Sequence, residues 1–228
     1  MLTFNPGHLE IIVISIAFTI FYLLFHFEVV DSLIRYLVKA STRIKQVTSV
    51  FLHRGLGVVL LGILPGLCAR LFLGKPFAAY GFSFSFPPVM LLFAAGLGIL
   101  LFPILFLYTK SPEAVRNVPQ ARPEKWNARL WIMNVISVSS YLIAYELCLR
   151  GYILFSLQRS MGDWPAVAVM TSLYTAIHLP QGRGEAAGSA VIGVIFGVFS
   201  LLSGSIFLPA LIHIYIFLTT DILAVLRH

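Results

Sequence analysis

Long apolar runs, separated by short polar or proline-containing segments, set the pattern of this chain. A membrane-spanning helix needs about 20 mostly apolar residues. Seven runs come near this length, at residues 9–29, 50–73, 88–108, 129–156, 164–180, 186–202 and 205–225. The fourth run is long enough to be tilted or broken, and an eighth, re-entrant piece also fits the pattern. We therefore predict an all-α, multi-pass transmembrane helical bundle with about seven spans, or eight.

Residues 31–49 differ from these runs because apolar and basic residues share them at helical spacing. Arg35, Lys39 and Arg43 follow one another at intervals of four, on a different face from the apolar side chains. Such a segment is typical of an amphipathic helix that lies on an anionic membrane surface. A solvated connector is the alternative.

Proline residues divide the runs into two groups. Pro112, Pro119 and Pro123 stand among charged residues, and proline at this density excludes a regular helix. We expect one structural unit in three parts. These are N-terminal membrane helices in residues 1–108, a cytoplasmic loop in 109–128, and a second set of helices, which holds the candidate chemistry, in 129–228.

The composition agrees with a lipid environment. Hydrophobic residues make up 59% of the chain and charged residues 11%, whereas soluble domains are about 25% charged. The formal net charge of +7 comes from basic residues between the apolar runs, which favours contacts with a membrane surface over binding of nucleic acid. With the N-terminus outside and the C-terminus inside, the outer segments hold only Arg70, Lys75 and Arg159, as the positive-inside rule requires.

An ionisable group inside a membrane-spanning run costs free energy, so each one needs a structural or functional explanation. Glu146 and Arg150 are one helical turn apart on a shared face, so the arginine can neutralise the carboxylate. The pair could fix helix packing, or it could hold a glutamate ionised as a general base.

Three further polar groups lie in later runs. His178 follows Tyr174 by one turn, His213 lies in the last run, and Asp221 is close to the inner end of that run, where we expect it to be solvated. A lone intramembrane histidine is more often a hydrogen-bond partner between helices than a catalyst. The literal GxxxG of Gly193 and Gly197 predicts close helix packing, which would bring neighbouring polar helices together.

These residues could build two kinds of site. In one, Glu146 and a histidine polarise a water that attacks a peptide carbonyl, and the other histidine donates to the developing oxyanion. In the other, the two histidines and Glu146 bind zinc. The sequence has no H-E-x-x-H helix, and Cys68 and Cys148 form no paired metal motif. We therefore favour a site without metal or other cofactor.

At these residues the chain resembles the CAAX protease and bacteriocin-processing (CPBP) family, which includes the CAAX prenyl protease 2 type and bacterial Abi proteins. The family motif E-E-x-x-x-R is similar to residues 145–150 (YELCLR), which are followed by Gly151. The motif F-x-x-x-H is similar to residues 174–178 (YTAIH), and H-x-x-x-N to residues 213–217 (HIYIF). The likeness covers about residues 129–221.

The resemblance implies an intramembrane endopeptidase with catalytic residues Glu146, His178, His213 and Arg150. Glu146 would be the base, His178 its partner, His213 the oxyanion donor and Arg150 the charge partner. Two positions depart from the motifs, because Tyr145 replaces the first glutamate and Phe217 replaces the asparagine.

The implied substrate is a membrane-embedded or lipidated peptide or protein, and the implied location is the inner membrane of a bacterial cell. The departures at Tyr145 and Phe217 leave open a degenerate family member that binds a membrane protein or a lipidated peptide. A third hypothesis is a small transporter. The two halves of the chain show no clear inverted repeat, which disfavours it.

Overall fold

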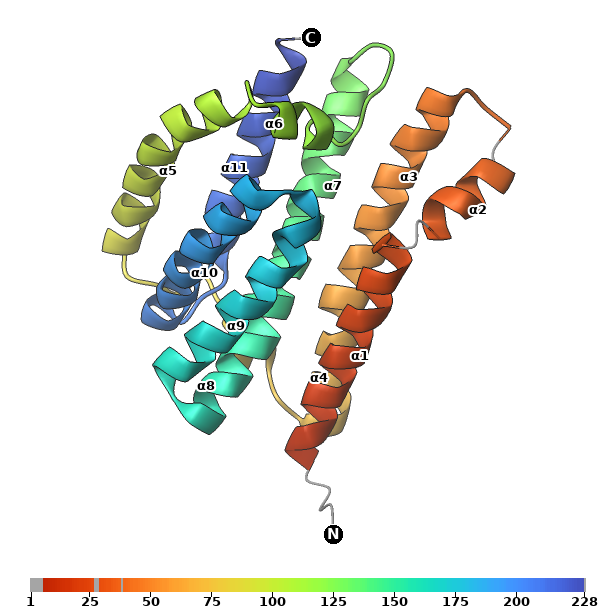
Figure 1. Ribbon diagram of the computed structural model, residues 1–228. Coiled ribbons are helices and arrows are strands. Elements are labelled where there is room, and N and C mark those ends of the chain that lie inside the picture. Colours follow the sequence, from red (N-terminus) through yellow and green to blue (C-terminus); the bar gives the residue numbers. More distant parts are fainter. Residues whose placement is uncertain (1–5, 27–28, 38, 228) are drawn as a thin grey trace.

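A computed structural model describes residues 6–26, 29–37 and 39–227, and the chain there is all-α, as predicted (Figure 1). The elements, in chain order, are α1 (Pro6–His26), α2 (Val29–Leu37), α3 (Thr42–Gly57), η1 (Val58–Ile63), α4 (Leu64–Leu73), η2 (Phe77–Tyr80), α5 (Val89–Tyr108), α6 (Pro112–Asn117), α7 (Ala128–Glu146), η3 (Leu147–Leu154), α8 (Phe155–Met161), α9 (Asp163–His178), η4 (Leu179–Gln181), α10 (Arg183–Ser203) and α11 (Phe207–Val225).

Five helices in the described part of the chain are long and apolar enough to cross a membrane. They are Thr42–Leu73, Val89–Tyr108, Ala128–Met161, Arg183–Ser203 and Phe207–Val225. A bent pair, Ser15–Leu24 with Val29–Leu37, raises the number to six if it acts as one span. The expected span at 164–180 forms α9, whose 16 residues are shorter than the ~20 that a bilayer requires.

The amphipathic segment expected at 31–49 is divided between two helices. Ser41 caps the second one, because its hydroxyl accepts a hydrogen bond from the backbone N–H of Ile44 at 3.4 Å. The Ser49 hydroxyl donates to the carboxylate of Asp31, which ties α3 back to α2. The interfacial position of α2 stays a prediction.

The proline-rich segment expected to be a loop contains one short helix. Pro112 starts α6, where proline is tolerated because the first N–H of a helix has no intrahelical partner. The Glu113 carboxylate accepts a hydrogen bond from the backbone N–H of Glu185 at 3.1 Å. Asn117 donates to the carbonyl of Gln181 at 2.9 Å, so α6 is fastened to the turn between α9 and α10.

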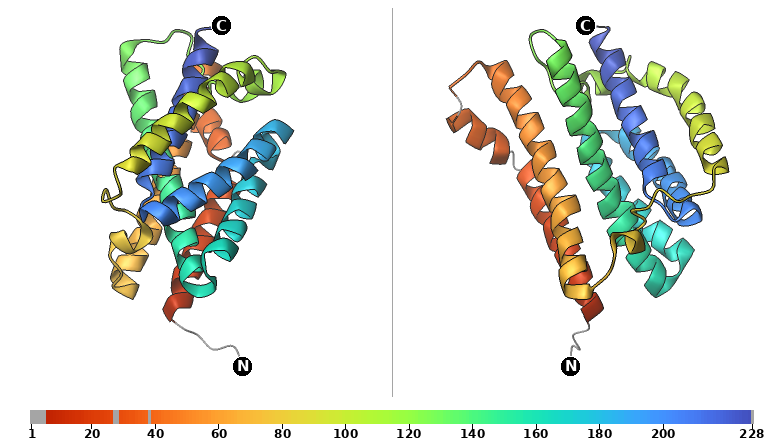
Figure 2. Two further views of the ribbon diagram at one scale, coloured as in Figure 1. Left: turned by 90° about the vertical axis from the view of Figure 1, so that its left-hand side faces the viewer. Right: turned by 180° about the vertical axis from the view of Figure 1, so that it is seen from behind.

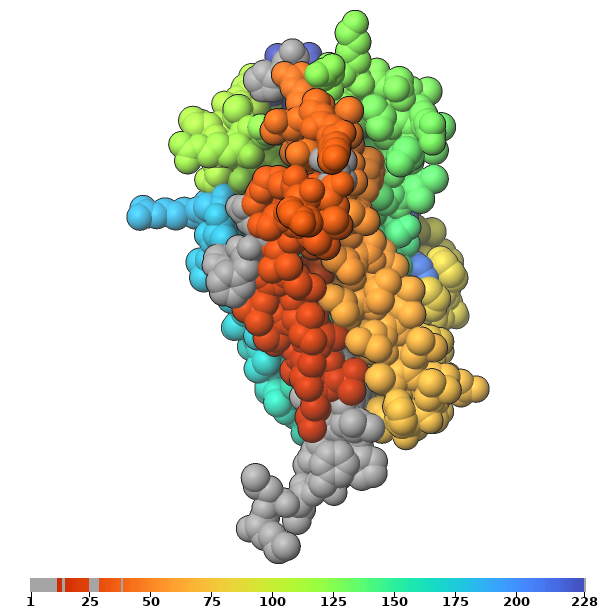
Figure 3. Space-filling model, turned by 90° about the vertical axis from the view of Figure 1, so that its right-hand side faces the viewer, coloured from red at the N-terminus to blue at the C-terminus, as the bar shows by residue number. Residues whose placement is uncertain are grey.

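Helix α7 lies at the centre of the arrangement, with α3 on one side of it and α11 on the other (Figure 2). Helix α1 runs beside α3 and α4 on the outer face (Figure 3). The turn after α2, the segment before α7 and the C-terminal end of α11 gather at one end of the molecule (Figure 1). The orientation of this arrangement in a membrane stays a prediction.

Two of the long helices contain π-helical turns, and these turns face each other. The π-helical segments are η1, within Thr42–Leu73, and η3, within Ala128–Met161. The Tyr152 hydroxyl in η3 donates to the carbonyl of Gly62 in η1 at 3.0 Å. A Cβ added to Gly62 would lie 3.0 Å from the Cβ of Ala144, so glycine at this position allows the close approach of the two helices. The π-helical turn of η3 begins directly after Glu146, and such turns are frequent at functional sites.

The segment between η2 and α5 holds the start of α11. The Ser205 hydroxyl donates to the carbonyl of Ser83 at 2.6 Å, and the Ile206 N–H donates to the carbonyl of Gly81 at 2.9 Å. Phe84 stacks on Phe207 with ring centroids 3.8 Å apart. These contacts fix the entry of the helix that carries His213.

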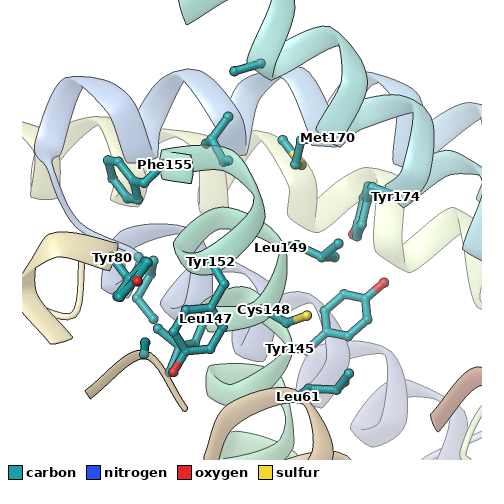
Figure 4. Packing of buried hydrophobic residues seen from close by; sticks show 14 of the residues in the cluster. Leu61, Tyr80, Tyr145, Leu147, Cys148, Leu149, Tyr152, Phe155, Met170 and Tyr174 are labelled. Carbon is teal, nitrogen blue, oxygen red and sulfur yellow. The ribbon is translucent and has the colours of Figure 1, made fainter. Parts of the chain in front are cut away.

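Close packing of α9 and α10 places the second histidine. A Cβ on Gly193 would lie 2.9 Å from Thr171 Cγ2, and one on Gly197 would lie 2.9 Å from Met170 Cε. The packing predicted from the GxxxG motif is therefore present. Figure 4 shows Met170 and Tyr174 of α9 packed beside the η3 turn.

Candidate active site in the bundle interior

Glu146 and Arg150 form an ion pair that is fully buried. The Arg150 Nη1 atom lies 3.2 Å from Oε1 and 3.1 Å from Oε2 of Glu146, and both side chains are 0% exposed. Glu146 is the last residue of α7, and Arg150 lies in η3. The contact expected from their spacing is thus present.

His213 completes this centre from α11. Its Nδ1 lies 2.6 Å from Oε1 of Glu146. A carboxylate can only accept, so Nδ1 carries the proton and donates it. In a neutral imidazole the other nitrogen, Nε2, is then an acceptor. The His213 side chain is 13% exposed, which leaves it more accessible than its two partners.

His178 and Arg150 both contact the ring of Tyr174, which connects His178 to this centre. Its Nδ1 donates to the backbone carbonyl of Tyr174 at 2.7 Å, so its Nε2 is also an acceptor when the ring is neutral. The Tyr174 ring lies 4.5 Å from the His178 ring, and the Arg150 guanidinium carbon lies 4.2 Å from the centre of the same Tyr174 ring. In the part of the chain that the structure describes, Glu146 bonds to His213 rather than to His178.

Tyr145 occupies the middle of the group, although it departs from the family motif. Its ring is buried, 5.9 Å from the ring of His213 and 6.1 Å from that of Tyr174. The hydroxyl ends of Tyr145 and Tyr174 face the same space in Figure 4. Two phenolic hydroxyls, which can donate hydrogen bonds, therefore flank the histidine and the carboxylate.

Several buried donors at this centre are not used within the described residues. The Nε and Nη2 atoms of Arg150 and the hydroxyls of Thr171 and Thr175 have no hydrogen-bond partner there. Most buried polar groups in proteins are paired, so such donors are candidates for contacts with a substrate.

Asp221 was expected to be solvated, and this prediction is wrong. Its side chain is 0% exposed, and its Oδ2 accepts a hydrogen bond from Asn134 Nδ2 at 3.2 Å. Asn134 Oδ1 in turn accepts from Arg54 Nη1 at 2.8 Å. The apolar inner end of α11 is thus covered by α7 and α3, and hydropathy along α11 alone does not show this.

The cluster of Arg54, Asn134 and Asp221 was missed in the sequence. An arginine inside the apolar run 50–73 was the available signal. The Arg54 guanidinium carbon lies 5.4 Å from the ring centre of Phe217, one turn beyond His213. The residue that departs from the third family motif therefore packs on a cation instead of offering a donor to the site.

No three His, Cys, Asp or Glu side chains converge to hold a metal ion within the described ranges. The zinc arrangement weighed for Glu146 and the two histidines has no support from donor geometry.

Helices long and apolar enough to cross a membrane therefore surround a buried carboxylate, arginine and histidine, an arrangement that agrees with an intramembrane protease. Residues 126–218 match the family described as type II CAAX prenyl endopeptidase Rce1-like, which confirms the family predicted from the motifs. The matched segment holds Glu146, Arg150, His178 and His213 but excludes Arg54 and Asp221. No curated protein and no solved structure matches the chain.

Proposed function

We propose that the chain is an intramembrane endopeptidase that hydrolyses a membrane-embedded or prenylated peptide, with Glu146 and His213 as a coupled pair. The family match supports this reaction class. The observation that carries the proposal is the 2.6 Å contact from His213 Nδ1 to Glu146 Oε1, with Arg150 on the other side of the carboxylate.

In this mechanism His213 Nε2 removes a proton from a water, whose oxygen attacks the peptide carbonyl carbon. The carbonyl π electrons move to its oxygen, which becomes the oxyanion of a tetrahedral intermediate. Glu146 holds the tautomer and stabilises the imidazolium, while Arg150 pairs with the glutamate from the other side. When the C–N bond breaks, the imidazolium returns the proton to the leaving amine nitrogen.

The hydroxyls of Tyr145 and Tyr174 supply the donors for the oxyanion. Both rings are buried beside His213, where a preorganised donor is worth more than in water. In this assignment His213 takes the role of base that the family motifs give to a glutamate, and Tyr145 takes a role that the motifs give to other residues. His178, with an acceptor at Nε2, would orient the substrate amide or the water.

The substrate class follows from the surroundings of the site. Apolar helices enclose it, so a scissile bond must reach it from the lipid or on a lipid-attached chain. The protein is an integral membrane protein. For its location we propose the inner membrane of a bacterium, with the C-terminus inside, on the distribution of basic residues.

The test is a cleavage assay in proteoliposomes with a farnesylated peptide that ends in a C-a-a-X sequence. Release of the last three residues is measured by mass spectrometry. We expect His213→Ala to reduce turnover by about 10²–10⁴-fold and Tyr145→Phe by about 10²-fold or more. Ser172→Ala, which removes an exposed hydroxyl on α9, is the matched control. A folded His213→Ala protein that cleaves at the normal rate contradicts the proposal.

A second candidate is a binding module that has lost the chemistry. The observation that favours it is that Phe217 packs on Arg54 where the family has a donor. This module would retain the same farnesylated peptide without cleaving it, and His213→Ala would leave its affinity unchanged. Equilibrium binding to the intact peptide distinguishes the two candidates.

A further inference from the structure

We propose that an anionic phospholipid binds between α5 and α11, with its headgroup at Lys110 and Arg227 and an acyl chain in the groove below them. This site lies away from the Glu146 centre and does not depend on the proposed peptidase function. Helix α5 crosses in front of α11 in the left view of Figure 2, and 11% of its apolar window is buried inside the protein.

The groove is formed by small residues of one helix and larger apolar residues of the other. Its volume is about 540 Å³, and its lining includes Ala95, Gly98 and Phe102 of α5 with Leu211 and Tyr215 of α11. A Cβ on Gly98 would touch the Tyr215 ring at 3.7 Å, an ordinary contact distance. The missing side chain at Gly98 therefore leaves the space open rather than filled by a neighbour.

Two cations lie near the ring of Phe106, which is one helical turn beyond the groove residue Phe102. The Lys110 ammonium lies 4.6 Å and the Arg227 guanidinium 4.7 Å from the ring centre of Phe106. Arg227 donates to the hydroxyl of Thr109 and to the carbonyl of Phe106. Within the described ranges neither cation forms an ion pair with a carboxylate. A basic pair at the end of a crevice between membrane helices is suited to a lipid phosphate.

The spacing of groove and cations fits one lipid molecule. Lys110 and Gly98 are twelve positions apart on α5, which is about 18 Å along a helix. One leaflet of the hydrocarbon core is about 15 Å deep. A lipid whose phosphate lies at the two cations therefore reaches Gly98 with its acyl chain.

The groove is smaller than the space that a whole helix occupies. A helix about 10 Å wide that crosses one leaflet of about 15 Å has a volume of roughly 1,200 Å³, more than twice that of the groove. Sixteen methylene groups, each about as large as a water at about 30 Å³, need about 480 Å³. The volume of the groove therefore matches one acyl chain.

The test is a titration of the detergent-purified full chain with dioleoyl phosphatidylglycerol and, separately, dioleoyl phosphatidylcholine, with bound lipid counted by native mass spectrometry. We expect tighter binding of phosphatidylglycerol. Replacing both cations, in Lys110→Gln/Arg227→Gln, should weaken phosphatidylglycerol about 30-fold and phosphatidylcholine little. Gly98→Leu fills the groove and should weaken both lipids. Ala95→Leu fills it from the neighbouring turn and replaces Gly98→Leu if that variant fails to fold.

Matched controls separate this site from general attraction to lipid. Gly96→Leu lies on a face of α5 where an added Cβ meets nothing within 4 Å, and Lys125→Gln/Arg129→Gln removes two exposed charges before and at the start of α7. Both should bind as the wild type does. Equal loss in the two charge-removing variants, or equal binding in Gly98→Leu and Gly96→Leu, overturns the proposal. A dimer that Gly98→Leu dissociates also overturns it, because a second copy would then occupy the groove.

Discussion

His213 and Glu146 are 67 positions apart in the sequence, and their side chains meet at 2.6 Å. The contact joins α11 to the end of α7, directly before the π-helical turn. Of the two side chains, the histidine is the more exposed, at 13% against 0% for the glutamate. The predictions below separate the chemical role of this centre from its structural role.

The first prediction concerns the buried ion pair. Glu146→Gln or Arg150→Met leaves one uncompensated charge in an apolar interior, and each should lower the free energy of unfolding by about 3–5 kcal/mol. The double variant should lose less than the sum of the two, because no charge is left unpaired. Unfolding in mixed micelles measures this cycle. Additive losses would show that the two side chains do not interact.

The second prediction concerns the residues that depart from the family motifs. Tyr145→Glu with Phe217→Asn recreates the motif residues. If Tyr145 donates to the oxyanion, this double variant loses the donor and places a second carboxylate beside Glu146, so turnover of the farnesylated peptide should fall by about 10²-fold or more. A gain in turnover would show instead that the natural chain has lost its chemistry at these two positions.

The third prediction concerns the polar cluster that links α3, α7 and α11. Arg54 is buried, and Arg54→Leu leaves Asp221 without the nearby charge. We expect a loss of about 3–5 kcal/mol in the free energy of unfolding. Arg43→Leu, an exposed change on the same helix, should stay within about 0.5 kcal/mol. If Arg54→Leu lowers the free energy of unfolding no more than Arg43→Leu does, the cluster contributes no stability.

Local patterns in the sequence predicted the parts of the site that depend on one helix or one helix pair. The Glu146–Arg150 pair follows from a spacing of four, and the α9–α10 packing follows from two glycines. The contact of Glu146 with His213 depends on how α7 and α11 are placed, which the π-helical turn and the segment at Ser83 decide. Neither leaves a periodic signal in the chain.

The burial of individual polar residues within the bundle was also not predicted from the sequence. Asp221 lies near the end of an apolar run, and its burial comes from Asn134 on another helix. The break before Thr42 was missed for a related reason, because a single capping serine ends a pattern that otherwise continues across it. A contact between distant segments decides the burial of Asp221, and a local cap decides the break before Thr42.

The last prediction concerns the packing that places Tyr174 and His178. A Cβ on Gly193 would lie 2.9 Å from Thr171 Cγ2 and 3.2 Å from Tyr174 Cδ1, so Gly193→Ala must displace one or both of these α9 side chains. We expect a loss of about 1–3 kcal/mol in the free energy of unfolding. We also expect lower turnover, since Tyr174 carries one of the proposed oxyanion donors. Gly188→Ala is the control on the same helix, because an added Cβ meets nothing within 4 Å there. It should be neutral or stabilise the helix by up to about 1 kcal/mol. If both variants fold and cleave alike, the close approach of α9 and α10 does not position the site, and the donor role of Tyr174 fails with it.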